Sequence, residues 1–153
     1  MSDLDLILTR QLNASPARVW RCWTEPHLLE QWFAPKPVIV SHVVIDLRPG
    51  GEFSSRMTLP DQTEMPLMGC YLVVEPERRL VFTDCLGPGF RPSPAPFFTA
   101  EVTLEPEGTG TRYTARAIHG KKETRDQHEQ MGFFDGWGTV AGQLDALAQT
   151  LPG

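Results

Sequence analysis

The sequence has few cysteines, no long apolar run and no excess of positive charge. Its three cysteines, Cys22, Cys70 and Cys85, lie far apart with no paired spacing, which argues against a zinc site or a disulfide framework. No apolar run approaches the roughly 20 residues that span a bilayer. The acidic residues 1–5 lack the cationic start of a secretory signal. These absences predict a soluble, cytoplasmic protein with no membrane span.

The charge balance and the motifs exclude further classes. The sequence has 14 Lys and Arg residues against 19 Asp and Glu, a net charge of −5. It therefore lacks the basic stripe with which proteins bind nucleic acid. There is no nucleophile elbow, phosphate-binding glycine loop or paired catalytic carboxylate signature. Because His27 and His42 have no partner at metal-ligand spacing, neither a metal site nor a cofactor is predicted.

What the sequence does have is the composition of one folded domain. It contains 153 residues, of which 41% are hydrophobic and 22% charged. A chain of this length buries roughly 70% of its unfolded surface, enough for a sizeable core. It shows no repeat, low-complexity tract or linker, so we expect a single domain over residues 1–153.

The order of the predicted elements is simple. Residues 4–12 are largely apolar and predict a strand, after which Ser15 and Pro16 favour the start of a helix. A second short helix is expected over residues 27–32. From residue 38 to residue 120 the apolar residues alternate with polar ones between turn sequences. This pattern is typical of an antiparallel meander with one covered face, and we expect six strands in it.

The C-terminal segment predicts the helix that covers this sheet. Thr124 and Gln127 have the spacing of a capping box, and a helical stripe continues to about Leu151. His128 falls opposite the stripe and is expected at the surface. The helix also contains four glycines, each unfavourable by about 1 kcal/mol relative to alanine. Three interpretations remain open: close approach of a loop or of a second subunit, as in a homodimer; a bend in the helix; or a tolerated cost.

This element order is that of the α+β helix-grip fold: a curved antiparallel sheet, two short helices and a long C-terminal helix. Several stretches follow one another in a familiar order: residues 12–20, 23–26, 31–33, 46–51, 69–71, 110–113 and 128–137. Together they resemble the family of activators of the heat-shock-chaperone ATPase (Aha-type), within the START-like SRPBCC superfamily. The resemblance implies a cavity under the sheet, which in the wider superfamily takes lipids, polyketides or other apolar small molecules. The eukaryotic co-chaperones of the family carry a further N-terminal domain that this sequence lacks.

Two polar residues are candidates for chemistry. His119 shares strand parity with the inward residues Tyr113, Ala115 and Ala117, so we expect it to face the interior near a strand end. There it would orient a ligand or exchange a proton, or simply be hydrogen-bonded in the core. Asp84 is the second catalytic candidate, because it could meet His119 across the cavity; the alternative is a solvated strand-end aspartate.

Other candidate ligand-binding residues are mostly aromatic. Each would equally suit ordinary core packing, but a concave sheet under one helix is difficult to close completely. The candidates, His119 included, are Trp32, Phe53, Met57, Phe82, Tyr113, His119, Gln130, Phe134 and Trp137. Inward-facing small residues such as Ser55 and Ala100 are expected to leave space under the helix. The proline-rich residues 86–96 are either a stiff lid with Phe90 as a plug or a surface connection.

The sequence therefore predicts a domain that binds an apolar or amphipathic small molecule between the sheet and the C-terminal helix. Burial of ligand carbon surface, at about 25 cal/mol per Å², would supply the favourable free energy. Two alternatives remain. One is a cyclase- or dehydratase-like enzyme that uses His119, assisted by Asp84 or Tyr113. The other is a module that interacts with a chaperone through its surface.

Overall fold

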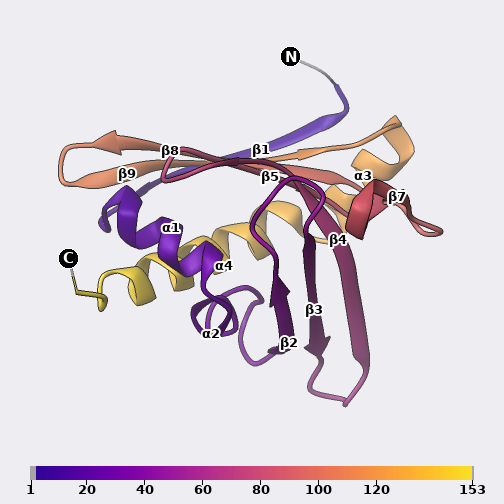
Figure 1. Cartoon of the computed structure of the whole chain (residues 1–153), viewed down its shortest axis with the longest axis horizontal. Helices are drawn as coiled ribbons and strands as arrows, with labels where there is room; N and C mark the ends of the chain where they lie inside the picture. Colours follow the sequence, from indigo (N-terminus) through magenta and orange to yellow (C-terminus); the bar gives the residue numbers. More distant parts are fainter. Residues whose placement is uncertain (1–2, 153) are drawn as a thin grey trace.

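A seven-stranded antiparallel sheet curves around two packed helices (Figure 1). The structure is a computed structural model, and it describes residues 3–152. In the main sheet the strand order is β1-β9-β8-β5-β4-β3-β2. Its strands are β1 (Asp5–Leu12), β2 (Ile39–Ile45), β3 (Glu52–Thr58), β4 (Glu64–Glu75), β5 (Arg79–Thr83), β8 (Thr99–Glu107) and β9 (Gly110–Ile118). The expected six-strand meander is confirmed, and β1 closes it by pairing with β9.

Four α-helices accompany the sheet in the described chain: α1 (Pro16–Thr24), α2 (Pro26–Leu29), α3 (Lys122–Gln130) and α4 (Phe133–Ala148). The Ser15 hydroxyl accepts a hydrogen bond from the backbone N–H of Arg18 at 3.4 Å, so the predicted start of α1 is confirmed. The second helix is shorter than expected and ends at Leu29. No helix in residues 3–152 is long and apolar enough to cross a membrane.

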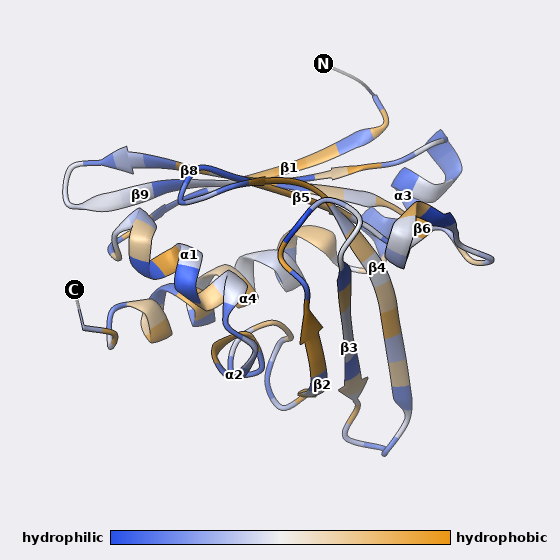
Figure 2. Ribbon diagram, viewed as in Figure 1, coloured by the Kyte–Doolittle hydropathy of each residue, from blue (hydrophilic) through white to orange (hydrophobic). Residues whose placement is uncertain are grey.

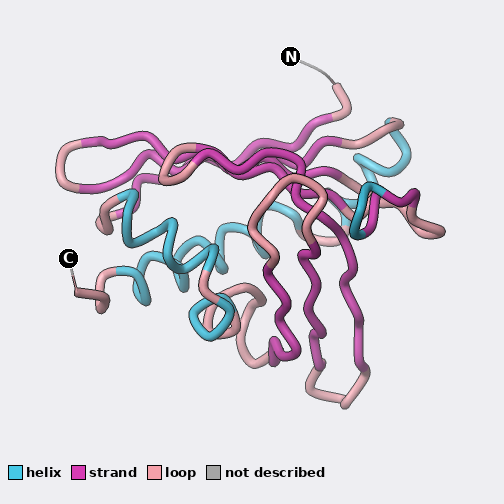
Figure 3. Tube along the Cα trace, in the orientation of Figure 1, coloured by secondary structure: helices cyan, strands magenta, loops and turns pink. Residues whose placement is uncertain are grey.

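The sheet has two parts, whose strands run in different orientations. Strands β1, β9 and β8 form the upper layer in Figure 1, with α1 and α4 beneath them. Strands β3 and β2 and the first part of β4 bend downward, and we call residues 39–69 the β2–β4 wing. Figure 3 shows that this wing extends beyond the helices as paired strands joined by a loop at the tip. One half of the concave face is therefore covered by helices and the other half is open.

Aromatic rings fill the covered half. Trp23 lies at the centre of this cluster, with ring centroids of Trp32, Phe33 and Phe82 within 4.8–5.6 Å of its own. The indole N–H of Trp32 donates to the carbonyl of Cys22 at 3.0 Å, which satisfies a polar group that is buried with the ring. The interior under the helices is thus packed with side chains.

The C-terminal segment is two helices, where one long helix was expected. Gly132 has a φ of +93°, a left-handed conformation that glycine adopts at little steric cost, and it separates α3 from α4. The bend proposed for the glycines is confirmed at this position. The predicted capping box is wrong: α3 begins at Lys122, and the side chain of its N-cap residue Lys121 makes no cap hydrogen bond.

Of the two interpretations of the proline-rich segment, a lid and a surface connection, the structure agrees with the second. It forms a small hairpin of β6 (Leu86–Gly87) and β7 (Arg91–Pro92), joined by the 3₁₀ turn η1 (Pro88–Phe90). The ring of Phe90 lies directly over Gly50, where an added Cβ would come within 2.7 Å of it. Phe90 therefore packs against the β2–β3 turn and does not plug the interior.

Strand β2 forms an open edge of the sheet. Its pairing with β3 shifts register between Ser41 and Val44, and His42 in the bulge has a φ of +56°. Figure 2 shows that β2 is strongly hydrophobic, and its first residue, Ile39, is largely exposed. The edge is thus apolar but irregular.

A carboxylate joins α4 to the N-terminal elements. The backbone N–H of Asn13 donates to both oxygens of Asp145 at 3.0 Å, and that of Ala14 donates to Oδ1 at 3.0 Å. These bonds fix the turn between β1 and α1 against α4, although the residues are more than 130 positions apart in the sequence.

Replacement of Asp145 by alanine tests this connection. We expect Asp145→Ala to lower the free energy of unfolding by about 1–3 kcal/mol, because two backbone N–H groups lose a charged acceptor. Urea titration followed by circular dichroism measures the change. Asp135→Ala, at an exposed position of the same helix, is the control and should cost about 0.5 kcal/mol or less. Equal losses in the two variants would contradict the role assigned to Asp145.

Candidate functional site

A small pocket opens where the covered and open halves of the concave face meet. Its volume is about 80 Å³. Four aromatic residues contribute to its walls: Phe33, Phe53, Phe82 and Phe98. We call it the β3–β5 pocket, because most of its lining comes from β3, β4 and β5.

The pocket follows from the register of β3 and β4. Phe53 lies opposite Gly69, and Ser55 lies opposite Leu67, so all four residues share the concave face. A Cβ at position 69 would come within 2.1 Å of the Thr83 carbonyl oxygen, so the close approach of β4 to that carbonyl requires glycine. The short side chain of Ser55 leaves space between the larger residues that line the pocket. The place of a side chain at Gly69 is occupied by the Thr83 carbonyl, so this glycine brings β4 and β5 together and adds no space.

The hydroxyl of Ser55 is an uncommitted polar group of this pocket. The residue is 6% exposed, and its hydroxyl has no hydrogen-bond partner among residues 3–152. This hydroxyl is therefore free to bond to a molecule that enters the pocket. The neighbouring Ser54 differs, since its hydroxyl donates to Glu52 at 2.6 Å. Ser55 is therefore a polar group that a bound molecule would satisfy.

Asp84 anchors one wall of the pocket. Its Oδ1 accepts hydrogen bonds from the backbone N–H groups of Phe97 and Phe98 at 2.8 and 2.9 Å. The adjacent Thr83 hydroxyl bonds to Thr99 Oγ1 at 2.8 Å. These bonds hold the chain before β8 in place, and with it the ring of Phe98. Oδ2 of Asp84 remains uncommitted within the described chain.

Two buried histidines lie behind Phe98. His119, 4% exposed, and His128, 7% exposed, face one another with Nε2 of the first 2.9 Å from Nδ1 of the second. The ring centroid of Phe98 is 6.2 Å from that of His119 and 4.9 Å from that of His128. Trp137 also contacts Phe98, at 5.8 Å between centroids. One aromatic ring thus separates the histidine pair from the pocket.

The proton positions in this pair follow from its partners. Nδ1 of His119 lies 2.7 Å from the carbonyl oxygen of Leu4, and because a carbonyl only accepts, this nitrogen donates. In the neutral pair Nε2 of His119 is therefore the acceptor, and Nδ1 of His128 is the donor. Burial, and secondly repulsion from a charged His119, together lower the pKa of His128 to about 4. His128 is therefore neutral near pH 7.

The burial of His128 corrects the expectation that it lies at the surface. That expectation placed His128 on the polar side of one continuous helix. Because the chain breaks at Gly132, the faces of α3 are not aligned with those of α4. His128 consequently points toward the sheet, where it contacts Phe97 and Phe133.

The expected binding residues are divided between five locations. Phe53 and Phe82 line the pocket. Trp32 and Tyr113 are buried in the core cluster, and Met57 is half-buried on the same face of β3 as Ser55. His119 and Trp137 lie behind Phe98. The remaining two, Gln130 and Phe134, are exposed. Of the inward small residues, Ser55 borders the pocket, whereas Ala100 is fully buried in the core.

The two catalytic candidates do not meet. Asp84 is bonded to the amides of Phe97 and Phe98, while His119 is bonded to Leu4 and His128. The ring of Phe98 stands over the histidines, so the carboxylate does not orient the imidazole. Asp84 therefore positions the loop before β8, and it does not form an acid–base pair with His119.

Sequence reasoning missed Leu67, Gly69, Phe98 and His128 as parts of this region. The pairing of β3 with β4 could have identified the first two, because the turn at residues 60–62 sets which residues are opposite. Phe98 and His128 depend on contacts between distant segments, for which one sequence gives no signal.

A second, shallower depression lies on the other side of α4. It has a volume of about 990 Å³ and runs between the segment from Glu30 to Val40 and the outer face of α4, including Thr139 and Gly142. Its wall is held by Gln143, whose side-chain amide donates to the carbonyls of Trp32 and Ala34. It is more open than the β3–β5 pocket, and the buried residues Ala34 and Val40 are part of its lining.

Comparisons with known proteins agree on the fold. The family profile described as "Activator of Hsp90 ATPase homolog 1-like protein" matches residues 13–149. A crystal structure of a protein from Nitrosomonas europaea is 46% identical, with 97% of this chain and 96% of that chain covered and a TM-score of 0.94. One from Mycobacterium smegmatis is 27% identical, with 99% and 94% covered and a TM-score of 0.81. Among curated proteins, none matches this chain.

The histidine pair predicts a specific dependence of stability on pH. His128 has an ordinary pKa of 6.5 and a folded pKa of about 4, so the folded state disfavours its protonation. The associated stability, about 3 kcal/mol, is present above pH 6.5 and is lost as the pH falls toward 4.

Urea denaturation from pH 7 to pH 4 checks this dependence. His128→Gln should be less stable at pH 7 but should lose less stability on acidification than the unmodified protein. His27→Gln, at an exposed histidine, is the control and should keep the original slope. The assignment fails if His128→Gln and the unmodified protein have the same slope.

Proposed function

The chain belongs to the family of Activator of Hsp90 ATPase homolog 1-like proteins, and we propose that it binds an apolar or amphipathic small molecule at the β3–β5 pocket. The single observation that carries this proposal is a pocket with four phenylalanine walls that is also lined by Ser55, whose hydroxyl makes no hydrogen bond within the described chain. A pocket lined mainly by apolar groups with a few oriented polar ones is typical of small-molecule sites.

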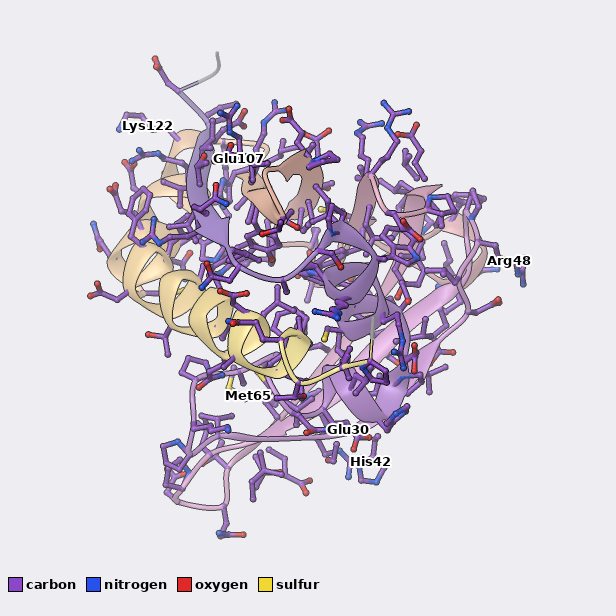
Figure 4. The ribbon with its side chains drawn as sticks, turned by 90° about the vertical axis from the view of Figure 1, so that its left-hand side faces the viewer. Glu30, His42, Arg48, Met65, Glu107 and Lys122 are labelled. Atoms are coloured by element: carbon purple, nitrogen blue, oxygen red, sulfur yellow. The ribbon has the colours of Figure 1, made fainter. Side chains whose placement is uncertain are left out.

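The wing extends the apolar surface beyond the pocket. Met57 lies opposite Met65, one step further along the face that carries Ser55 and Leu67. Met65 and Leu67 are both exposed. In Figure 4 Met65 lies on the lower side of the molecule, where Glu30 also lies. A ligand larger than the pocket would therefore seat one end between the phenylalanines and lay the remainder on the wing. Methionine and leucine side chains suit such a variable contact.

The free energy available from this arrangement is adequate. Covering apolar surface yields about 25 cal/mol per Å², so a ligand that buries about 200 Å² gains roughly 5 kcal/mol before the cost of association. A hydrogen bond to Ser55 would add specificity. The arrangement suits a ligand bound at the boundary between the covered and the open halves of the concave face, where the helices leave the sheet uncovered.

Filling the pocket tests the proposal. We expect Ser55→Leu to weaken binding of the neutral apolar dye Nile red by about tenfold or more, because the leucine side chain occupies the space. Fluorescence titration measures the affinity, and thermal unfolding checks that the variant is folded. Native mass spectrometry of the unmodified protein and Ser55→Leu, purified from cells, shows whether a retained molecule is lost.

The matched control is Thr139→Leu, which places the same side chain in the second depression. It should leave Nile red binding unchanged. Loss of binding in Thr139→Leu, with Ser55→Leu unaffected, would move the site to that depression and contradict the proposal. A role at a chaperone surface, which the family name suggests, predicts that Ser55→Leu leaves chaperone ATPase stimulation intact.

A further inference from the structure

The polar groups at the β3–β5 pocket select one class of ligand head group. We infer that the ligand carries a hydrogen-bond-donating head, a hydroxyl or an ammonium group, and not a carboxylate. This inference rests on the proposed function, since it concerns which molecule enters the same pocket.

The charge at the pocket has one sign. Asp84 lines it, whereas no lysine, arginine or histidine is among the residues that line it in the described chain. A carboxylate placed in this partly buried space would meet a like charge without a cation to compensate, which is unfavourable at low effective dielectric. An ammonium group would meet the opposite charge.

The hydrogen-bonding capacity points the same way. Oδ1 of Asp84 already accepts two backbone N–H groups, so its second oxygen is the acceptor that is left. The Ser55 hydroxyl both donates and accepts. An ammonium head can donate to both groups, and a hydroxyl head can donate to Asp84 while it accepts from Ser55. A carboxylate can only accept and could use Ser55 alone. The aromatic walls add to this preference, because ring faces attract cations.

Arg91 is a cationic side chain near the pocket that could bind a carboxylate. It lies in an adjoining depression that also contains Asp84, Leu67 and Met68. Arg91 is exposed in the β6–β7 hairpin, and it does not line the β3–β5 pocket. Water screens a charge at such a position more strongly than one in the pocket. The test therefore includes a variant of Arg91.

Three probes that share one body separate the head groups. They are 3-phenyl-1-propanol, 3-phenylpropylamine and 3-phenylpropanoate, titrated at pH 7.5 into ¹⁵N-labelled protein and followed by amide chemical shifts. We expect the amine and the alcohol to bind at least about tenfold more tightly than the carboxylate. Shifts should concentrate at residues of β3, β4 and β5.

Two variants assign the selectivity to its residues. Asp84→Asn keeps a side-chain carbonyl that can accept the N–H groups of Phe97 and Phe98 but removes the charge, so the preference for the amine over the carboxylate should fall by about tenfold. Ser55→Ala should weaken the alcohol about three- to tenfold. Glu30→Gln, which removes a charge beside the second depression, should leave all three affinities unchanged.

The outcomes distinguish this inference from the proposed function. Equal or tighter binding of the carboxylate, or an unchanged preference in Asp84→Asn, overturns the donor-head assignment while pocket binding stands. Carboxylate binding that disappears in Arg91→Gln overturns it too, because the adjoining depression would then hold the head. If none of the probes binds although Nile red does, the assignment is wrong. If Nile red also fails to bind, the proposed function itself is wrong.

Discussion

The hydrogen bonds from Asp84 to the amides of Phe97 and Phe98 are the constraint on which the site depends. They place one ring, that of Phe98, between two different environments. On one side it forms a wall of the pocket, and on the other it covers the histidine pair. A single carboxylate at the end of β5 therefore couples the shape of the open half of the sheet to the packing of α3.

Side chains fill most of the interior between the sheet and the helices. Trp23, Trp32 and Phe82 pack edge to face or tilted under the sheet, and large rings in such contacts leave little space. The space expected under the C-terminal helix is largely occupied, and the space that remains is at the boundary with the wing. There the short side chain of Ser55 lies between larger residues that line the pocket.

Sequence patterns were sufficient for the fold and for only part of the site. Alternation and turn chemistry predicted the meander, and Ser15 and Pro16 predicted the start of α1, because these signals act within a few residues. They failed at Gly132, where one left-handed residue resets the helical phase and turns His128 inward. Phe53 and Phe82 were identified as candidates, but Phe98 was not, because its position depends on Asp84 and on histidines from two other elements.

The irregular edge of the sheet has its own consequence. Strand β2 offers an apolar, unpaired border, which in a flat strand would be a template for cross-β association between molecules. The shifted register between Ser41 and Val44, with His42 in a left-handed conformation, interrupts the regular row of donors and acceptors that an incoming strand would need. This bulge therefore disfavours pairing of β2 with a strand of a second molecule, and straightening it would favour such pairing.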